Sequence, residues 1–217
     1  RFESKSKKPI RMQVDFETWR TKERELIDIE KHITLGGPAI IQPDKIFEMK
    51  EDKIMWCHRN ETSFWDYDKK AAQHSELNIP PLEDPILHRT FGGIISGESL
   101  KRSGPASLIS GKMSKENNFN VYILTAKTDT LKQWQDQVIS IQKRVEETKI
   151  TDRRKVHQKW WEDFWIRSWI FIDGDEEART VSQVYNLQRF MNAIAGRGEQ
   201  PIKFNGSLFT MPVLRDF

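Results

Sequence analysis

The chain has 217 residues, which suits one large domain or two small ones because domains cluster at about 100–150 residues. With 37% hydrophobic residues, 8 Trp, 12 Phe and 3 Tyr, its composition excludes an intrinsically disordered chain. The 35 basic and 32 acidic residues leave a net charge of +3, and no apolar run approaches the ~20 residues that cross a bilayer. We therefore expect a globular protein with neither nucleic acid nor membrane as a partner.

The basic residues nearest to forming a cluster lie at the start of the chain. Lys5, Lys7, Lys8 and Arg11 follow one another closely there. A nucleic-acid contact would need such a stripe, but a solvated terminus, or an edge strand protected by lysines, explains it more simply. We adopt the second interpretation. A salt-dependent affinity for nucleic acid would support the first.

From residue 10 to about residue 126 the sequence is typical of an all-β region, because short apolar or alternating runs are separated by Gly, Pro, Asn and Asp. Strands are predicted at 10–16, 54–58, 87–95 and 119–125. Alternation in the first places Ile10, Met12, Val14 and Phe16 on one face. The Gly92–Gly93 pair favours a bulge or a close approach of neighbouring backbones. We expect an antiparallel β-sandwich.

Near residue 125 the apolar period changes from two to about three and a half. A helix of about 17 residues is predicted after a cap at Thr128 or Asp129. Its apolar face comprises Leu131, Trp134, Val138, Ile141 and Val145. The transition from strands to helices is the clearest indication of domain organisation in the sequence.

Two more helices are predicted beyond the first. One begins near residues 151–152, and another spans about 176–195, separated by a short extended piece at 168–172. The acidic residues Asp173, Asp175, Glu176 and Glu177 fit a turn and a favourable helix N-terminus. The last helix has an apolar face that a lone helix would leave without partners, formed by Val184, Leu187, Met191 and Ile194.

Four of the eight tryptophans lie within ten residues, at positions 160, 161, 165 and 169. Indole faces stack on the C–H faces of sugars, and the indole N–H can bond a hydroxyl, so clefts for glycans carry such residues. The competing interpretation is that these rings pack helix against helix. Trp161 and Trp165 are our candidates for sugar contact.

The loop that follows the last predicted helix carries polar side chains between glycines. Arg197 and Lys203 are hydrogen-bond donors, and Asn205 both donates and accepts. These three residues are the leading candidates for binding sugar hydroxyls. The loop lacks the glycine patterns of phosphate-binding loops.

Cys57 is the sole cysteine, which excludes an intrachain disulfide and a multi-cysteine zinc site. His58 beside it would point to the opposite face of a strand. We therefore interpret Cys57 as a buried structural residue and predict no metal, no cofactor and no catalytic residue in this chain.

Several segments resemble the α-L-fucosidases of glycoside hydrolase family 95. The resemblance rests on residues 157–169 (HQKWWEDFWIRSW), 185–191 (YNLQRFM) and 201–206 (PIKFNG), and upstream on 84–93 (DPILHRTFGG) and 121–134 (VYILTAKTDTLKQW). Family members carry Leu-Gln-Gly where this chain has Phe204-Asn205-Gly206. The chain thus resembles a divergent relative of unknown specificity.

The resemblance implies an α+β architecture in which a β-super-sandwich leads through helices into an (α/α)6 barrel. The expected organisation is a sandwich region at 1–126, a helical linker at 127–172 and the first helix and loop of an incomplete barrel at 173–217. It also implies a fragment of an exported bacterial glycoside hydrolase, periplasmic or secreted, whose partners are carbohydrate and the remainder of the parent chain. The alternative is a non-catalytic carbohydrate-binding or structural module of the same fold.

Overall fold

The computed structural model describes residues 1–25, 40–49, 52–62, 84 and 86–195. It is a mixed α+β structure with antiparallel sheets and three described helices, which confirms the predicted class. The chain divides into two compact units, Arg1–Glu147 and Thr148–Phe217. None of the described helices is both long and apolar enough to cross a membrane.

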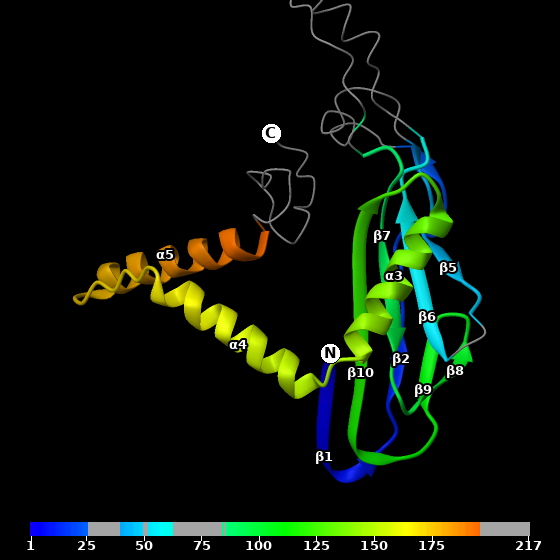
Figure 1. Ribbon diagram of the computed structural model, residues 1–217, viewed down its shortest axis with the longest axis horizontal. Helices are drawn as coiled ribbons and strands as arrows, with labels where there is room; N and C mark the ends of the chain where they lie inside the picture. The colour runs from blue at the N-terminus through cyan, green and yellow to red at the C-terminus, as the bar shows by residue number, and fades with distance from the viewer. Residues whose placement is uncertain (26–39, 50–51, 63–83, 85, 196–217) are drawn as a thin grey trace, which may run out of the picture. The chain divides into compact units, whose positions relative to one another are not determined.

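A five-stranded antiparallel sheet forms the centre of the first unit (Figure 1). Its strands in spatial order are β1 (Phe2–Ile10), β10 (Ser114–Lys127), β7 (Arg89–Ser96), β6 (Lys53–Arg59) and β5 (Lys45–Phe47). The predicted strands at 54–58, 87–95 and 119–125 correspond to β6, β7 and β10. Strands β6 and β7 lie in the interior of the sheet, and both of their faces are mostly buried because other elements pack on each side.

Strand β7 contains the Gly92–Gly93 pair, and both neighbours approach it closely. A Cβ atom on Gly92 would lie 2.1 Å from the main-chain oxygen of Trp56, and one on Gly93 would lie 2.1 Å from that of Tyr122. The register with β6 and with β10 runs without a shift through both glycines. The predicted close approach is confirmed, and the alternative of a bulge is wrong.

Strand β1 lies at an edge of the five-stranded sheet and pairs only with β10 among the described strands. Lys5, Lys7 and Lys8 on this strand are exposed, and Lys5 pairs with Glu116 at 3.2 Å. The interpretation of the N-terminal basic run as a lysine-protected edge strand is therefore confirmed.

One face of this sheet packs against a three-stranded sheet. That sheet consists of β2 (Gln13–Asp15), β9 (Ser107–Ser110) and β8 (Leu100–Gly104), and a separate pair joins β3 (Arg24–Glu25) to β4 (Ile40–Ile41). The core between the three-stranded and the five-stranded sheet is formed by the buried residues Ile54, Ile95, Leu100 and Leu108.

The predicted strand at 10–16 is two pieces in different sheets, the end of β1 and then β2. Met12, Val14 and Phe16 pack against the core as expected, but Ile10 is exposed. The single-strand prediction is wrong because alternation cannot show that the chain leaves one sheet for another.

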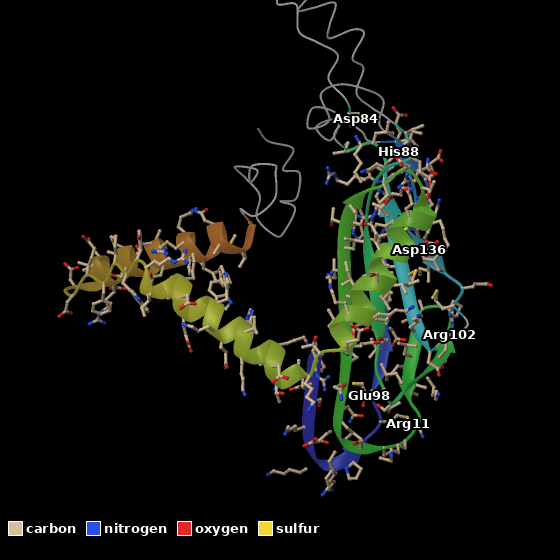
Figure 2. All side chains as sticks on the ribbon, in the orientation of Figure 1. Arg11, Asp84, His88, Glu98, Arg102 and Asp136 are labelled. Carbon is tan, nitrogen blue, oxygen red and sulfur yellow. The ribbon has the colours of Figure 1, made fainter. Side chains whose placement is uncertain are left out.

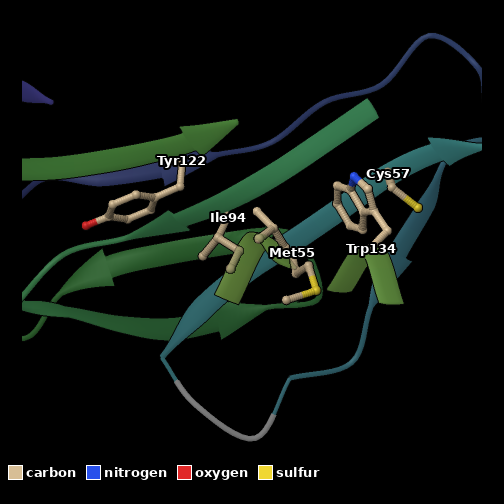
Figure 3. Packing of buried hydrophobic residues seen from close by; sticks show 6 residues of the cluster. Met55, Cys57, Ile94, Tyr122 and Trp134 are labelled. Carbon is tan, nitrogen blue, oxygen red and sulfur yellow. The ribbon is translucent and has the colours of Figure 1, made fainter. Parts of the chain in front are cut away.

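The opposite face of the five-stranded sheet carries helix α3 (Leu131–Glu146), which the sequence placed in the linker. Trp134 and Val138 of this helix are fully buried and pack against Met55, Cys57, Ile94 and Tyr122 of the sheet (Figure 3). The Trp134 Nε1 atom donates a hydrogen bond to the Leu124 carbonyl at 3.3 Å. Because α3 packs on the sheet, it belongs to the first unit.

Helix α3 begins with a capping box. The Thr130 hydroxyl accepts from the Gln133 main-chain N–H, and the Gln133 side chain accepts in return from the Thr130 N–H. The cap is therefore Thr130. The predicted caps, Thr128 and Asp129, lie two residues and one residue before it. At the other end, the Tyr122 hydroxyl on β10 donates to Glu146 at 3.0 Å.

The second unit contains helices α4 (Ile150–Ile166) and α5 (Glu176–Ala195), joined by a short connection. Asp175 caps α5 by accepting from the Ala178 N–H at 3.0 Å, as expected. Residues 168–172 are not assigned to a strand; instead the Ser182 hydroxyl accepts from the Ile172 N–H at 2.9 Å. The predicted apolar face of α5 is largely exposed at Val184, Leu187 and Ile194.

Candidate functional site

Aromatic side chains form a row along α4. Trp161 lies at the centre of the row, with its ring centroid 4.8 Å from that of Trp160, 5.5 Å from Phe164 and 6.1 Å from Trp165. Phe190 of α5 stacks on Trp161 at 5.4 Å. The rings therefore pack helix against helix, and they fix the Trp161 indole in one orientation.

Arg189 of α5 ties the two helices together. Its guanidinium lies 4.7 Å from the Phe164 ring centre and 5.7 Å from that of Trp165. It donates to the Ser168 carbonyl at 2.7 Å, just beyond the C-terminus of α4, where a cation is favourable. The Tyr185 hydroxyl lies 2.9 Å from that of Ser168, and this hydrogen bond, aided by Arg189, lowers the pKa of Tyr185. These polar contacts hold the hairpin at its connecting end.

A groove of about 580 Å³ lies at the other end of the hairpin, between the N-terminal half of α4 and the last turn of α5. It is lined by Thr148, Asp152, Arg153, Val156, His157, Trp160, Trp161, Ala193 and Ile194. This volume falls within the range of small-molecule sites, and the lining combines apolar surface with a few polar groups. The groove is the candidate binding site.

The predicted site residues are placed as follows. Trp161 lines the groove. Trp165 does not; its ring packs between Trp161 and Trp169, with centroids 6.1 and 5.9 Å away. Arg197, Lys203 and Asn205 lie outside the described residues.

The Trp161 indole N–H is already used within the helix. It donates to Nε2 of His157, one turn earlier, at 3.2 Å. This corrects the expectation that it would be free to bond a sugar hydroxyl. Because Nε2 accepts, the neutral His157 ring carries its proton on Nδ1. Trp161 therefore lines the groove with an indole whose N–H is already bonded.

Sequence reasoning missed Arg153, His157 and Trp160 as groove residues. The signal was present, because Arg153, His157 and Trp161 recur at intervals of four and so lie on one helix face. The α5 contribution, Ala193 and Ile194, has no such signal, because it depends on how the hairpin closes.

The first unit has a buried polar cluster centred on Asp44, at the start of β5. Its carboxylate accepts from the Arg20 Nε atom at 2.6 Å and from the Thr18 hydroxyl, and it lies 3.0 Å from Nδ1 of His58. The side chains of Asp44 and His58 are 4% and 8% exposed. Burial, together with the Arg20 charge, lowers the pKa of His58, although Asp44 opposes the shift.

This cluster suits a structural role. The His58 ring packs against Phe91 at 5.1 Å, and the Arg20 guanidinium lies 4.5 Å from the Trp19 ring centre and 5.1 Å from that of Phe91. It therefore joins three segments that are distant in sequence and leaves the imidazole little access to a substrate. An aspartate and histidine in contact do not make a catalytic site without a nucleophile within reach.

Cys57 is fully buried in the core beneath α3, which confirms its interpretation as a structural residue. Burial raises the pKa of its thiol to about 12, so the thiolate is scarce at neutral pH. Within the described part of the chain, no group of three His, Cys, Asp or Glu side chains is placed to hold a metal ion.

Comparison with known proteins adds a family but no function. No curated protein and no solved structure matches the chain. One family model matches residues 1–170, which include the whole first unit and α4 but not α5. Since this match covers well over half of the 217 residues, the chain belongs to the family described as DUF5703_N, a domain of unknown function.

Proposed function

We propose that this chain is part of a glycoside hydrolase-like protein, in which it supplies scaffold and one wall of a sugar-binding cleft. In this proposal the antiparallel sheets are the sandwich portion, and α5 is the first helix of an (α/α)6 barrel. The order of strands followed by helices supports the proposal, as do the sequence segments that resemble the family 95 fucosidases. The protein would be exported from a bacterial cell.

The observation that carries the proposal is the pair of indoles at the groove. Trp160 is 37% exposed, and Trp161 is held by rings on several sides. Both line a groove that also offers the polar groups of Thr148 and Asp152. Such a combination suits a pyranose ring, whose C–H face stacks on indole while its hydroxyls bond to polar groups at the edge.

The groove itself favours binding over bond cleavage. Glycoside hydrolysis needs an acid and a second carboxylate on opposite sides of the scissile bond. Among the described residues that line the groove, Asp152 is the single carboxylate. The second candidate is therefore a non-catalytic carbohydrate-binding module of the same fold, and in the first candidate the catalytic pair lies outside this groove.

Binding is tested by titrating the chain with a panel of oligosaccharides while following tryptophan fluorescence. Trp160→Ala and Trp161→Ala are expected to weaken binding by about threefold to tenfold each, the value of one aromatic contact. Trp169→Ala is the matched control, because Trp169 is exposed but does not line the groove. A panel that leaves the wild-type fluorescence and melting temperature unchanged would refute the proposal.

Turnover separates the two candidates. Product release from any glycan that binds, measured by reducing-sugar assay on the intact protein, supports the hydrolase. Binding that raises the melting temperature without release of product supports the non-catalytic module.

A further inference from the structure

Strand β10 extends beyond the strand that pairs with its outer side. It pairs with β7 from Asn120 to Lys127, whereas β1 pairs with it only between Ser114 and Phe119. Figure 1 shows β1 beside the first half of β10, and no described strand lies beside the second half on that side. The second half of β10 is therefore an edge of the five-stranded sheet.

Three residues direct main-chain groups to this edge. The Tyr122 carbonyl points toward β7, because a Cβ atom on Gly93 of β7 would lie 2.1 Å from its oxygen. Neighbouring residues of an antiparallel strand direct their N–H and C=O groups to opposite sides. Those of Val121, Ile123 and Thr125 therefore point away from β7, and none of them bonds to a described residue. We call these three residues the open edge of β10.

The side chains at the open edge favour strand pairing. Val121 is 39% exposed and Ile123 is 68% exposed, and both are β-branched. They lie on the face of the sheet opposite α3, because the alternate residues Tyr122 and Leu124 pack toward that helix. No charged residue occurs from 117 to 126, whereas β1 carries three exposed lysines. The open edge thus lacks the charges that ordinarily protect an edge strand.

We propose that the open edge of β10 is a strand-addition site for an extended segment of another polypeptide. The added strand continues the line of β1, because the open edge follows directly on the β1–β10 ladder, and it therefore runs antiparallel to β10. Main-chain hydrogen bonds supply its affinity. β-branched residues at alternate positions of the partner pack against Val121 and Ile123 and supply specificity.

Amide hydrogen exchange in the free chain should alternate along this part of β10. The Tyr122 and Leu124 amides face β7 and should exchange slowly, whereas those of Ile123 and Thr125 should exchange fast. The measurement uses NMR on the full chain, at a concentration where sedimentation velocity shows a monomer. Slow exchange at the open edge in that sample would overturn the proposal, because the edge would already be paired.

A short synthetic peptide is the probe for the partner strand. It alternates valine and threonine between terminal lysines, and its control has proline in place of the central valine, which removes a main-chain donor. The first peptide is expected to slow exchange at the open edge at least about tenfold, and to bind at least about tenfold more tightly than the control. Unchanged exchange, or equal binding of the two peptides, would overturn the proposal.

Variants locate the peptide on β10. Ile123→Lys and Thr125→Lys add the kind of charge that protects other edge strands, and each is expected to weaken binding at least about fivefold. Met113→Lys is the matched control, because Met113 is 59% exposed and precedes β10. Circular dichroism and the melting temperature establish that each variant is folded. Equal affinities in all three variants would overturn the proposal, because the peptide would then bind elsewhere.

A second copy of this chain is the competing occupant of the open edge. Two copies that pair through β10 would form a dimer in sedimentation velocity, with slow exchange at the open edge, and both signals would disappear on dilution and in Ile123→Lys. That outcome would overturn the proposal of a separate partner. None of these results bears on sugar binding, because the residues that line the groove belong to the second unit.

Discussion

Arg59 joins the sheet to the start of α3, and its replacement should loosen that junction. The side chain is 7% exposed and forms a fork between two segments. One terminal nitrogen donates to the His88 carbonyl at 2.9 Å and to the Thr90 hydroxyl at 2.8 Å. The other donates to the main-chain carbonyls of Thr128 at 2.8 Å and Asp129 at 3.1 Å. The first nitrogen also lies 3.3 Å from the Thr128 hydroxyl, and all five acceptors are uncharged oxygens.

The same fork supports a strained turn. His88 has a positive φ of 62°, an uncommon conformation for a residue other than glycine, and its carbonyl is one of the Arg59 acceptors. Asp84, four residues before His88, stabilises the turn by accepting from the N–H groups of Ile86 and Leu87 at 2.9 and 3.1 Å. Figure 2 shows Asp84 and His88 together at one end of the sheet. Loss of the Arg59 contact therefore removes support from this turn as well as from the helix.

Arg59→Met removes a charged donor from three main-chain carbonyls, of which the His88 carbonyl keeps the Thr90 hydroxyl at 3.4 Å, and the cost is about 1–3 kcal/mol for each carbonyl left buried and unsatisfied. Relief from burying a charge offsets part of this, so the expected loss in unfolding free energy is about 3–5 kcal/mol. Arg59→Lys keeps the charge but cannot reach both segments, and about 1.5–3 kcal/mol should be lost. Arg11→Met, at an exposed position, is the control and should stay within about 0.5 kcal/mol.

The single cysteine provides an assay that reports on the first unit alone. Cys57 is buried in that unit, so its labelling by a thiol reagent across a urea series gives the unfolding midpoint without a contribution from the helical hairpin. A midpoint for Arg59→Met equal to that of Arg11→Met would refute the reasoning. Such a result would mean that water satisfies the freed carbonyl groups in place of the guanidinium, without loss of stability.

Three further predictions use the same assay. Trp134→Ala should lower the unfolding free energy by about 3–5 kcal/mol, because the buried ring and its hydrogen bond are removed. The control Trp19→Ala should lower it by less than about 1 kcal/mol, because Trp19 is 72% exposed. Similar losses in the two variants would contradict the assigned core. Folding lowers the pKa of His58, so the unfolded state binds a proton more tightly than the folded state does. The urea midpoint of the wild type should therefore fall as the pH drops from 7.5 through the unfolded pKa of 6.5, and the midpoint of His58→Asn should fall less. Parallel pH profiles would exclude His58 as the cause. Gly92→Ala should give no folded first unit, because its Cβ would meet a main-chain oxygen of β6 at 2.1 Å, while Gly104→Ala, with its nearest contact at 3.5 Å, should remain folded.

Local patterns predicted most of the elements. Helix α5 begins and ends where the sequence indicates, because an acidic turn that includes the cap Asp175 precedes it and the apolar period persists to its end. Strands β6, β7 and β10 were found because their apolar runs are bounded by turn residues. The start of α3 was misplaced because Thr128, Asp129 and Thr130 are all good caps, and only the reciprocal bond with Gln133 selects the third.

Interactions between distant segments could not be predicted. The Arg59 fork links positions up to 70 residues apart, and Arg20, Asp44 and His58 meet from three separate segments. No periodicity records such pairs. The groove could be predicted only in part. Its α4 residues recur at helical spacing, whereas the contribution of its α5 residues depends on how the hairpin closes.

The pairing of β1 with β10 has a consequence for synthesis. Ser6 on β1 meets Lys115 on β10 across 109 residues of chain. At translation rates of about 5–20 residues per second, β1 waits roughly 5–20 s after it is made before its partner exists. During that interval an unpaired strand is open to other nascent chains. Its lysines thus protect the chain before folding more than they stabilise it afterwards, and replacing Lys5, Lys7 and Lys8 with threonine would lower the soluble yield in cells while changing the stability of the purified protein little.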